Sequence, residues 1–162
     1  MRLAIISDTH LPRGTRSLPT RCLAELRAAD AILHGGDFTR VEVLRLLEAI
    51  GPPVHGVHGN IDDDALTRML PAARVVEAAG ARIAMIHDAG QKTGRLARMR
   101  ARFKDADAVV FGHSHLPLHE QAQDGFQIFN PGSPTDRRNA PEHTMGIATI
   151  EAGLLRFELL RL

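Results

Sequence analysis

Leu3-Ala4-Ile5-Ile6-Ser7-Asp8-Thr9-His10, near the start of the chain, is an apolar run that breaks abruptly into polar side chains. A run without polar alternation predicts a strand that is buried on both faces, as in a parallel sheet. The pattern returns at Ala31-Ile32-Leu33, which ends at His34-Gly35-Gly36-Asp37, and at residues 54–57, which end at His58-Gly59-Asn60. Each of the three strands is therefore expected to stop at a polar loop that contains glycine or serine.

Apolar residues at helical spacing separate these strands, over residues 18–29 and 41–50. Gly51-Pro52-Pro53 then ends the second helix. The order strand–helix–strand–helix–strand predicts an α/β fold whose parallel strands are joined by right-handed crossovers.

The second half of the chain has a different pattern. Asp62 or Asp63 is expected to cap a short helix that ends at Pro71. The other expected elements are a hairpin of strands 74–79 and 82–86, a helix 93–103, a buried strand 108–111, and antiparallel strands at 118–122, 126–129, 144–150 and 154–159. Residues 29–35 and 106–112 are similar, and we interpret both as a helix-to-strand transition followed by a buried strand, not as a duplication.

Composition indicates an ordinary globular chain. With 162 residues, 44% hydrophobic and 24% charged, residues 1–162 are expected to form a single domain. The formal net charge of +1 makes large nucleic acid an unlikely partner, and the arginines at 95, 98, 100 and 102 are expected on a solvated helix face.

Cys22 is interpreted as a buried structural thiol. No apolar run is long enough to span a membrane or to act as a secretory signal, so a cytoplasmic location is expected.

Five of the apolar strands end at a short cluster of Asp, His, Asn, Ser and Gly residues. In an α/β sheet, ligands bind beyond the carboxyl ends of the strands, so these clusters are expected to converge. Carboxylate, imidazole and amide ligands without a thiolate suit Mn²⁺, Fe or Zn²⁺, and seven ligands suit two ions that share a carboxylate. The expected metal ligands are Asp8, His10, Asp37, Asn60, His87, His113 and His115.

These motifs, in this order, resemble those of the calcineurin-like metallophosphoesterases. Asn130-Pro131-Gly132-Ser133 and the small size resemble the short YfcE-like phosphodiesterase branch. The resemblance implies a four-layer α/β/β/α sandwich of two mixed sheets flanked by helices. It also implies two divalent ions, with Mn²⁺ preferred and Fe, Zn²⁺ or Ni²⁺ as alternatives. A hydroxide between the two ions would attack phosphorus.

The resemblance further implies how the ligands divide. Asp8, His10, Asp37 and His115 would hold the first ion, and Asn60, His87 and His113 would complete the second, with Asp37 as the bridge. Asp37, Asn60 and His87 are expected to be catalytic. His58, Ser133 and Arg137 are the expected substrate contacts, and Arg13 and Arg138 are further candidates for binding phosphate.

Two positions depart from the family pattern. Relatives carry a His after the metal-binding Asn, where it protonates the leaving group, but this chain has Ile61. The proton could come from a metal-bound water or from Asp62, or the substrate could have a good leaving group. His87-Asp88-Ala89-Gly90 replaces the His-Gly-His that many relatives carry, so the substrate pocket is expected to differ there.

The remaining histidines carry weaker expectations. His34 is a candidate for orienting a ligand by a hydrogen bond. His55, His119 and His143 are expected to be ordinary surface or strand residues.

The sequence thus favours a metal-dependent phosphodiesterase acting on a small phosphate ester, with a monoesterase as the less favoured enzyme. Two alternatives remain open: a protein-binding scaffold like the retromer subunit Vps29, and a nuclease for short single strands. A homo-oligomer is also left open.

Overall fold

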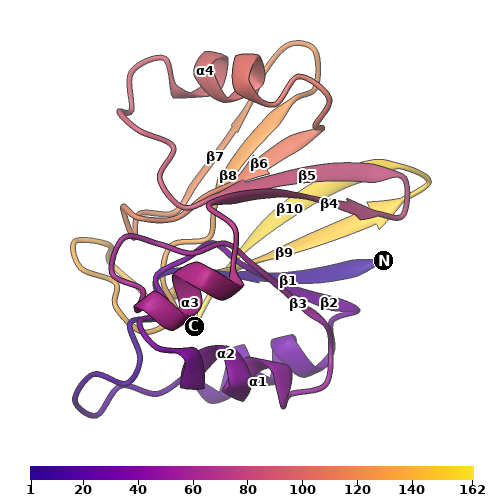
Figure 1. The fold of residues 1–162 in the computed structure, drawn as a ribbon. Coiled ribbons are helices and arrows are strands. Elements are labelled where there is room, and N and C mark those ends of the chain that lie inside the picture. The colour runs from indigo at the N-terminus through magenta and orange to yellow at the C-terminus, as the bar shows by residue number, and fades with distance from the viewer.

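Two five-stranded sheets stack face to face, and helices cover the outer face of each, as Figure 1 shows. This computed structural model describes residues 1–162. The four layers, from helix α4 through both sheets to helices α1 and α2, confirm the predicted α/β/β/α sandwich.

The first sheet has the strand order β10-β9-β1-β2-β3. Strands β1 (Arg2–Ile6), β2 (Ala31–His34) and β3 (Val54–Gly56) are parallel, as predicted, and helices α1 (Thr20–Arg27) and α2 (Val41–Glu48) connect them. Strands β9 (Thr144–Glu151) and β10 (Leu154–Arg161) extend the sheet antiparallel beside β1.

The second sheet has the order β4-β5-β6-β8-β7. Strands β4 (Ala73–Ala78) and β5 (Ala81–Ile86) form the predicted hairpin, and β5 is parallel to β6 (Ala108–Val110). Helix α4 (Arg95–Arg102) connects β5 to β6, and the short helix α3 (Asp64–Met69) precedes β4.

The expectation of purely antiparallel pairing after residue 118 is wrong for one strand. Strand β8 (Gln127–Asn130) is antiparallel to β7 (Leu118–Gln121) but parallel to β6. The chain reverses after β6 to form β7 and reverses again in the β7–β8 hairpin. Strand β8 therefore runs in the direction of β6 and lies beside it.

The apolar runs are continuous because both faces of the central strands are covered. Leu3 and Ile5 of β1 pack into the core between the sheets, whereas Ala4 and Ile6 pack against α1 and α2. A third core lies under α4, around Phe111 and other buried residues. Each strand is thus fixed from two sides, and the loops at its carboxyl end are held in place.

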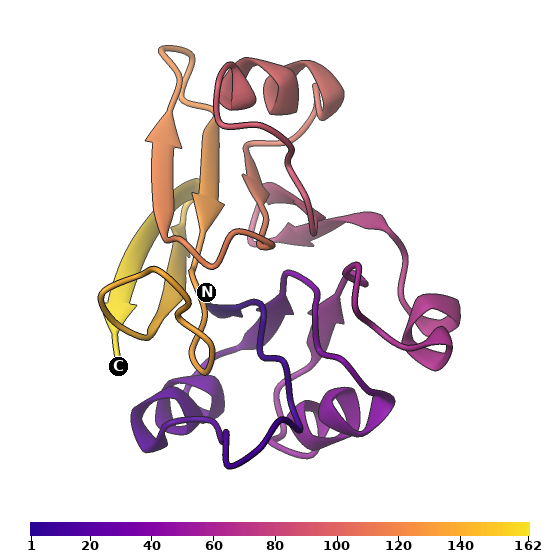
Figure 2. The same cartoon turned by 90° about the vertical axis from the view of Figure 1, so that its left-hand side faces the viewer.

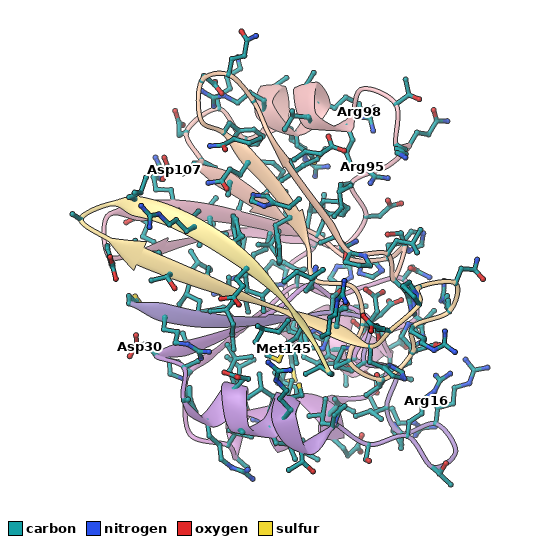
Figure 3. The ribbon with its side chains drawn as sticks, turned by 180° about the vertical axis from the view of Figure 1, so that it is seen from behind. Arg16, Asp30, Arg95, Arg98, Asp107 and Met145 are labelled. Atoms are coloured by element: carbon teal, nitrogen blue, oxygen red, sulfur yellow. The ribbon has the colours of Figure 1, made fainter.

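The two similar segments make the same contact in the two sheets. Asp30 accepts a hydrogen bond from the amide of Arg2 and donates its own amide to the Arg2 carbonyl. Asp107 does the same with Arg82. In Figure 3 both aspartates lie at the end of the sheets away from the labelled Arg16. These pairs set the register of β1 with β2 and of β5 with β6, which confirms the predicted helix-to-strand transitions.

None of the four helices combines the length and the apolar composition that crossing a bilayer would require.

Cys22 lies fully buried on α1, as the sequence predicted, and burial raises the pKa of its thiol to about 12. Because only the thiolate reacts readily, we expect a disulfide reagent such as DTNB at pH 8 to modify Cys22 no faster than the chain unfolds. Absorbance of the released thiolate, recorded across a urea titration, measures this. Rapid stoichiometric labelling of the native protein would contradict the placement of Cys22.

Candidate metal centre

The loops that follow β1, β2, β3, β5 and β6 meet at one end of the two sheets. Figure 2 looks onto this end, which forms the left-hand side of Figure 1. The parallel strands of each sheet point their carboxyl ends here, so residues from distant parts of the chain come together. All seven predicted ligands lie on these loops.

One group of ligand side chains comprises Asp8, His10 and His115. One ligand atom from each lies within 4.8 Å of the others, and all three residues are buried. The Nε2 of His115 is 3.4 Å from the Oδ1 of Asp8. These are the residues expected to hold the first ion together with Asp37.

The second group gathers around His87. Its Nε2 lies 3.1 Å from the Oδ1 of Asn60 and 3.3 Å from the Nδ1 of His113. The Nδ1 of His113 is itself 2.9 Å from the Oδ1 of Asn60. Asn60 and His113 are exposed, so this group forms the open side of the centre.

Asp37 lies between the two groups. Its Oδ2 is 3.3 Å from the Nε2 of His10, and its Oδ1 is 3.3 Å from the Nε2 of His87. The two oxygens of one carboxylate thus face different groups, which is the arrangement that a bridging ligand requires.

Several of these atoms face one another as hydrogen-bond acceptors. His87 Nδ1 lies 2.8 Å from the Gly35 carbonyl, and His115 Nδ1 contacts the Asp136 carbonyl. A carbonyl only accepts, so both Nδ1 atoms carry a proton, and in the neutral rings both Nε2 atoms present a lone pair to oxygen. The Nε2 of His115 and both ring nitrogens of His10 are buried without a hydrogen-bond partner. A divalent cation satisfies such a cluster, and the residues therefore fit a metal.

The pKa values reflect the same crowding. Burial raises the pKa of Asp8 to about 6 and lowers the pKa of His115 to about 4. Burial acts against ionised Asp37 as well, but its contacts with His10 and His87 outweigh burial and hold the pKa of Asp37 well below its usual range. Burial lowers the pKa of His87, yet Asp37 and Asp8 together raise it above its usual value. Asp37 therefore stays ionised, and around Asp37 and His87 the centre favours positive charge, which a metal ion supplies without a proton.

The backbone of the ligand loops is strained. Five of the seven ligands have a positive φ, a region that costs L-residues roughly 1–2 kcal/mol each and that Asp and His enter more often than most. They are Asp8 (56°), His10 (47°), Asp37 (59°), His113 (68°) and His115 (58°). Strain of this kind is found where surrounding structure enforces a functional geometry.

Two glycines leave room for the ligands. A Cβ at Gly59 would lie 2.0 Å from the Oδ1 of Asp37, and one at Gly112 would lie 2.6 Å from the Oδ2 of Asp8. Neither position can carry a side chain while the carboxylate keeps its place, which explains glycine directly before Asn60 and directly before His113.

His34 lies between two ligand loops, and it hydrogen-bonds to residues beside the ligands, not to a ligand itself as the sequence suggested. Its Nδ1 accepts a hydrogen bond of 3.2 Å from the Gly36 amide, and its Nε2 lies 3.2 Å from the Oγ1 of Thr9. Burial lowers the pKa of His34 to about 3, so it is neutral at physiological pH. Thr9 precedes His10 and Gly36 precedes Asp37, so one uncharged ring connects two ligand loops.

Asp62 does not cap helix α3; Asp63 does, by accepting a hydrogen bond from the Leu66 amide. The Asp62 carboxylate accepts hydrogen bonds from the amides of Asp37, Thr39 and Gly59, at 3.2, 2.6 and 2.7 Å. Asp62 therefore joins the Asp37 loop to the Asn60 loop. Burial outweighs these bonds and raises the pKa of Asp62.

The predicted substrate contacts lie around the ligands. The Ser133 hydroxyl is buried and donates to the Asp8 carbonyl at 2.8 Å, so it supports a ligand loop. Arg137 is exposed and donates to the Ala140 carbonyl, and His58 is half-buried. Arg138 is exposed, and its positive charge contributes to the low pKa of His115. Substrate binding by these residues remains a prediction.

The arginines of α4 bind loop carbonyls instead of forming only a solvated face. Arg95 donates to the Gly90 carbonyl, and Arg98 donates to the carbonyls of Ala89, Gln91 and Thr93. Figure 3 shows both side chains at the loop that follows His87. Helical spacing alone could not reveal these contacts, because they depend on how the loop folds back.

Asp136 and Arg16 are two residues near the centre that the sequence did not indicate. They lie on irregular loops with no periodic pattern and no motif spacing.

Fold and site together define a class: a metal-dependent phosphoesterase with two stacked sheets and a ligand cluster at their common edge. The model of the calcineurin-like phosphoesterase superfamily domain matches residues 1–153. The chain belongs to this superfamily.

Relatives agree with this assignment. A probable metallophosphoesterase of Methanothermobacter thermautotrophicus is 31% identical over 163 residues, which cover 99% of this chain and 92% of the relative. An archaeal phosphodiesterase of known structure has a TM-score of 0.75 at 21% identity and covers 99% of this chain and 100% of its own. Vps29 of Entamoeba histolytica, solved with Zn²⁺, has a TM-score of 0.78 at 22% identity and covers 99% of each chain. At these identities, the last two show the shared fold.

Replacement of Asp62 by Ala is expected to destabilise the protein by about 2–3 kcal/mol, because three amides between the ligand loops lose their acceptor. Urea denaturation of the metal-free protein measures the loss. Asp64→Ala is the control, since Asp64 is exposed in the first turn of α3 and its removal should cost less than about 1 kcal/mol. Equal stability of Asp62→Ala and wild type would show that Asp62 does not join the loops.

Proposed function

We propose that the protein is a phosphodiesterase that uses two divalent metal ions to hydrolyse a small phosphate ester. Asp8, His10, Asp37 and His115 would hold one ion, and Asp37, Asn60, His87 and His113 the other. The position of Asp37 carries the proposal, since its two oxygens face a different imidazole on either side at 3.3 Å.

Ions held there would neutralise charge on the phosphoryl oxygens and lower the pKa of a water molecule. The protein's own part is to hold the ligands ready. The Gly35 and Asp136 carbonyls fix the rings of His87 and His115, and the His113 amide, 3.1 Å from each carboxylate oxygen, fixes Asp8. Buried Asp8, His10 and His115 keep bulk water from one side of the centre, so substrate approaches from exposed Asn60 and His113.

The donor set guides the choice of metal. Carboxylate and amide oxygens suit Mn²⁺, and imidazole nitrogens suit Fe, Zn²⁺ or Ni²⁺. Three of the seven proposed ligands, Asp8, Asp37 and Asn60, offer oxygen, and we propose Mn²⁺ as the preferred ion, with Fe, Zn²⁺ or Ni²⁺ as alternatives.

A small diester is the proposed substrate. The net charge of +1 gives little attraction for a long polyanion. The fold shared with an archaeal phosphodiesterase supports the reaction class. The fold is shared equally with Vps29, so a scaffold function is the alternative that the activity test decides.

Asp37→Ala should lower the turnover of bis(p-nitrophenyl) phosphate in the presence of Mn²⁺ by at least about a hundredfold, because each of the two ions would lose the carboxylate that they share. Release of nitrophenolate at 405 nm measures this. Asp105→Asn, at an exposed site, is the control and should match wild type. Prior removal of metal by a chelator should abolish activity, and Mn²⁺ should restore it. Tight binding of a partner chain without any turnover would favour the scaffold instead.

The residue after Asn60 predicts a dependence on the leaving group. Ile61 is 41% exposed and cannot donate a proton from its side chain, so leaving groups of high pKa should react slowly. Ile61→His should raise kcat for an alkyl diester by about tenfold or more and change kcat for the nitrophenyl diester little. A series of diesters with graded leaving-group pKa gives the slope for both proteins. Identical slopes would show that the proton comes from elsewhere.

A further inference from the structure

Asp136, on the loop between β8 and β9, contacts two of the ligands in the first group. Its backbone carbonyl accepts a hydrogen bond from the Nδ1 of His115. Its carboxylate Oδ2 lies 3.7 Å from the Nδ1 of His10, a buried nitrogen that has no hydrogen-bond partner. One residue therefore faces, on two imidazoles, the nitrogens that point away from the proposed metal.

The turn that carries Asp136 also contacts the loop of Asp8. The Ser133 hydroxyl donates to the Asp8 carbonyl at 2.8 Å and accepts from the Asp136 amide at 2.8 Å. The Thr135 hydroxyl donates to the Thr9 carbonyl at 2.5 Å. The turn is thereby fixed against the first group, and no hydrogen bond or ion pair of Ser133, Thr135 or Asp136 reaches the second group.

Arg16 holds the Asp136 carboxylate from outside. Its Nη1 lies 3.1 Å from the same Oδ2 that faces His10. The Asp136 side chain is 13% exposed and that of Arg16 is 29% exposed, so the pair is shielded from solvent more than a surface ion pair is. Arg16 belongs to the loop after β1, which Figure 3 shows extending beyond the sheets at the labelled side chain.

We propose that Asp136 is a positioning residue for the first metal ion. Its carboxylate keeps the proton of His10 on Nδ1, so that Nε2 presents its lone pair toward Asp37 and the metal. Its carbonyl does the same for His115, and Arg16 keeps the carboxylate in place. A carboxylate behind a ligating imidazole orients the ring and raises its basicity, and the loss of such a partner typically weakens metal binding by 10–100-fold. This inference rests on the proposed function, since it assigns supports within the same centre.

The test is calorimetric titration of the metal-free protein with Mn²⁺. Asp136→Asn should weaken the binding of one ion by about tenfold or more and leave the binding of the other within about threefold of wild type, because the polar contacts of Asp136 with ligands are to His10 and His115 only. Arg16→Gln should weaken the binding of the same ion by a smaller factor. The double variant should bind as Asp136→Asn does, because Arg16 acts through Asp136. Asp105→Asn is the control.

Unfolding of the metal-free proteins separates positioning from a general structural role. Asp136→Asn keeps the backbone carbonyl and the size of the side chain, so its urea midpoint without metal should stay near that of wild type. A lower urea midpoint of metal-free Asp136→Asn together with an unchanged Mn²⁺ affinity overturns the inference. Equal weakening of the binding of both ions also overturns it. If wild type binds Mn²⁺ and Asp136→Asn binds it equally well, this inference alone fails. If wild type binds no Mn²⁺, the proposed function fails with it.

Discussion

Hydrogen-bond acceptors face one another in a buried site, and the rest of the functional architecture depends on this constraint. Asp37 faces His10 and His87, and His115 faces Asp8, with nitrogen–oxygen distances of 3.3–3.4 Å. With the protons of His87 and His115 held on the far nitrogens by backbone carbonyls, lone pairs meet across these gaps. Such an arrangement is unfavourable in a low-dielectric interior until a cation occupies it. The centre is therefore organised for metal before any metal binds.

The fold maintains this unfavourable arrangement by enclosing it. Central strands are packed on both faces, and the Arg2–Asp30 and Arg82–Asp107 pairs fix the register of the parallel strands. The strand ends consequently cannot shift to relieve the strained backbone of the ligand loops. Glycine at 59 and at 112 allows the loops to approach closely enough for the carboxylates to fit between them.

Three kinds of support surround the ligands, and each makes its hydrogen bonds with a different chemical group. Neutral His34 connects two loops by hydrogen bonds, and ionisable Asp62 gathers three backbone amides. Arg95 and Arg98 hold the loop after His87 through its carbonyl oxygens. The arginines that composition would assign to solvent thus stabilise an irregular loop, because carbonyls without a helical or strand partner need donors.

The sequence by itself determined most of the strands and helices, because the apolar periodicity and the abrupt change to polar residues are local properties. It also singled out seven candidate ligands, which the structure brings together at one end of the two sheets. The sequence also drew attention to His34, which the structure places between two ligand loops, and it predicted Cys22 as a buried thiol. The pairing of β8 with β6, the role of Asp62 and the contacts of Asp136, Arg16, Arg95 and Arg98 were decided only by the tertiary structure. Each of these depends on which loops lie side by side, and that is set by long-range packing of the two sheets, which leaves no periodic or motif signal along the chain.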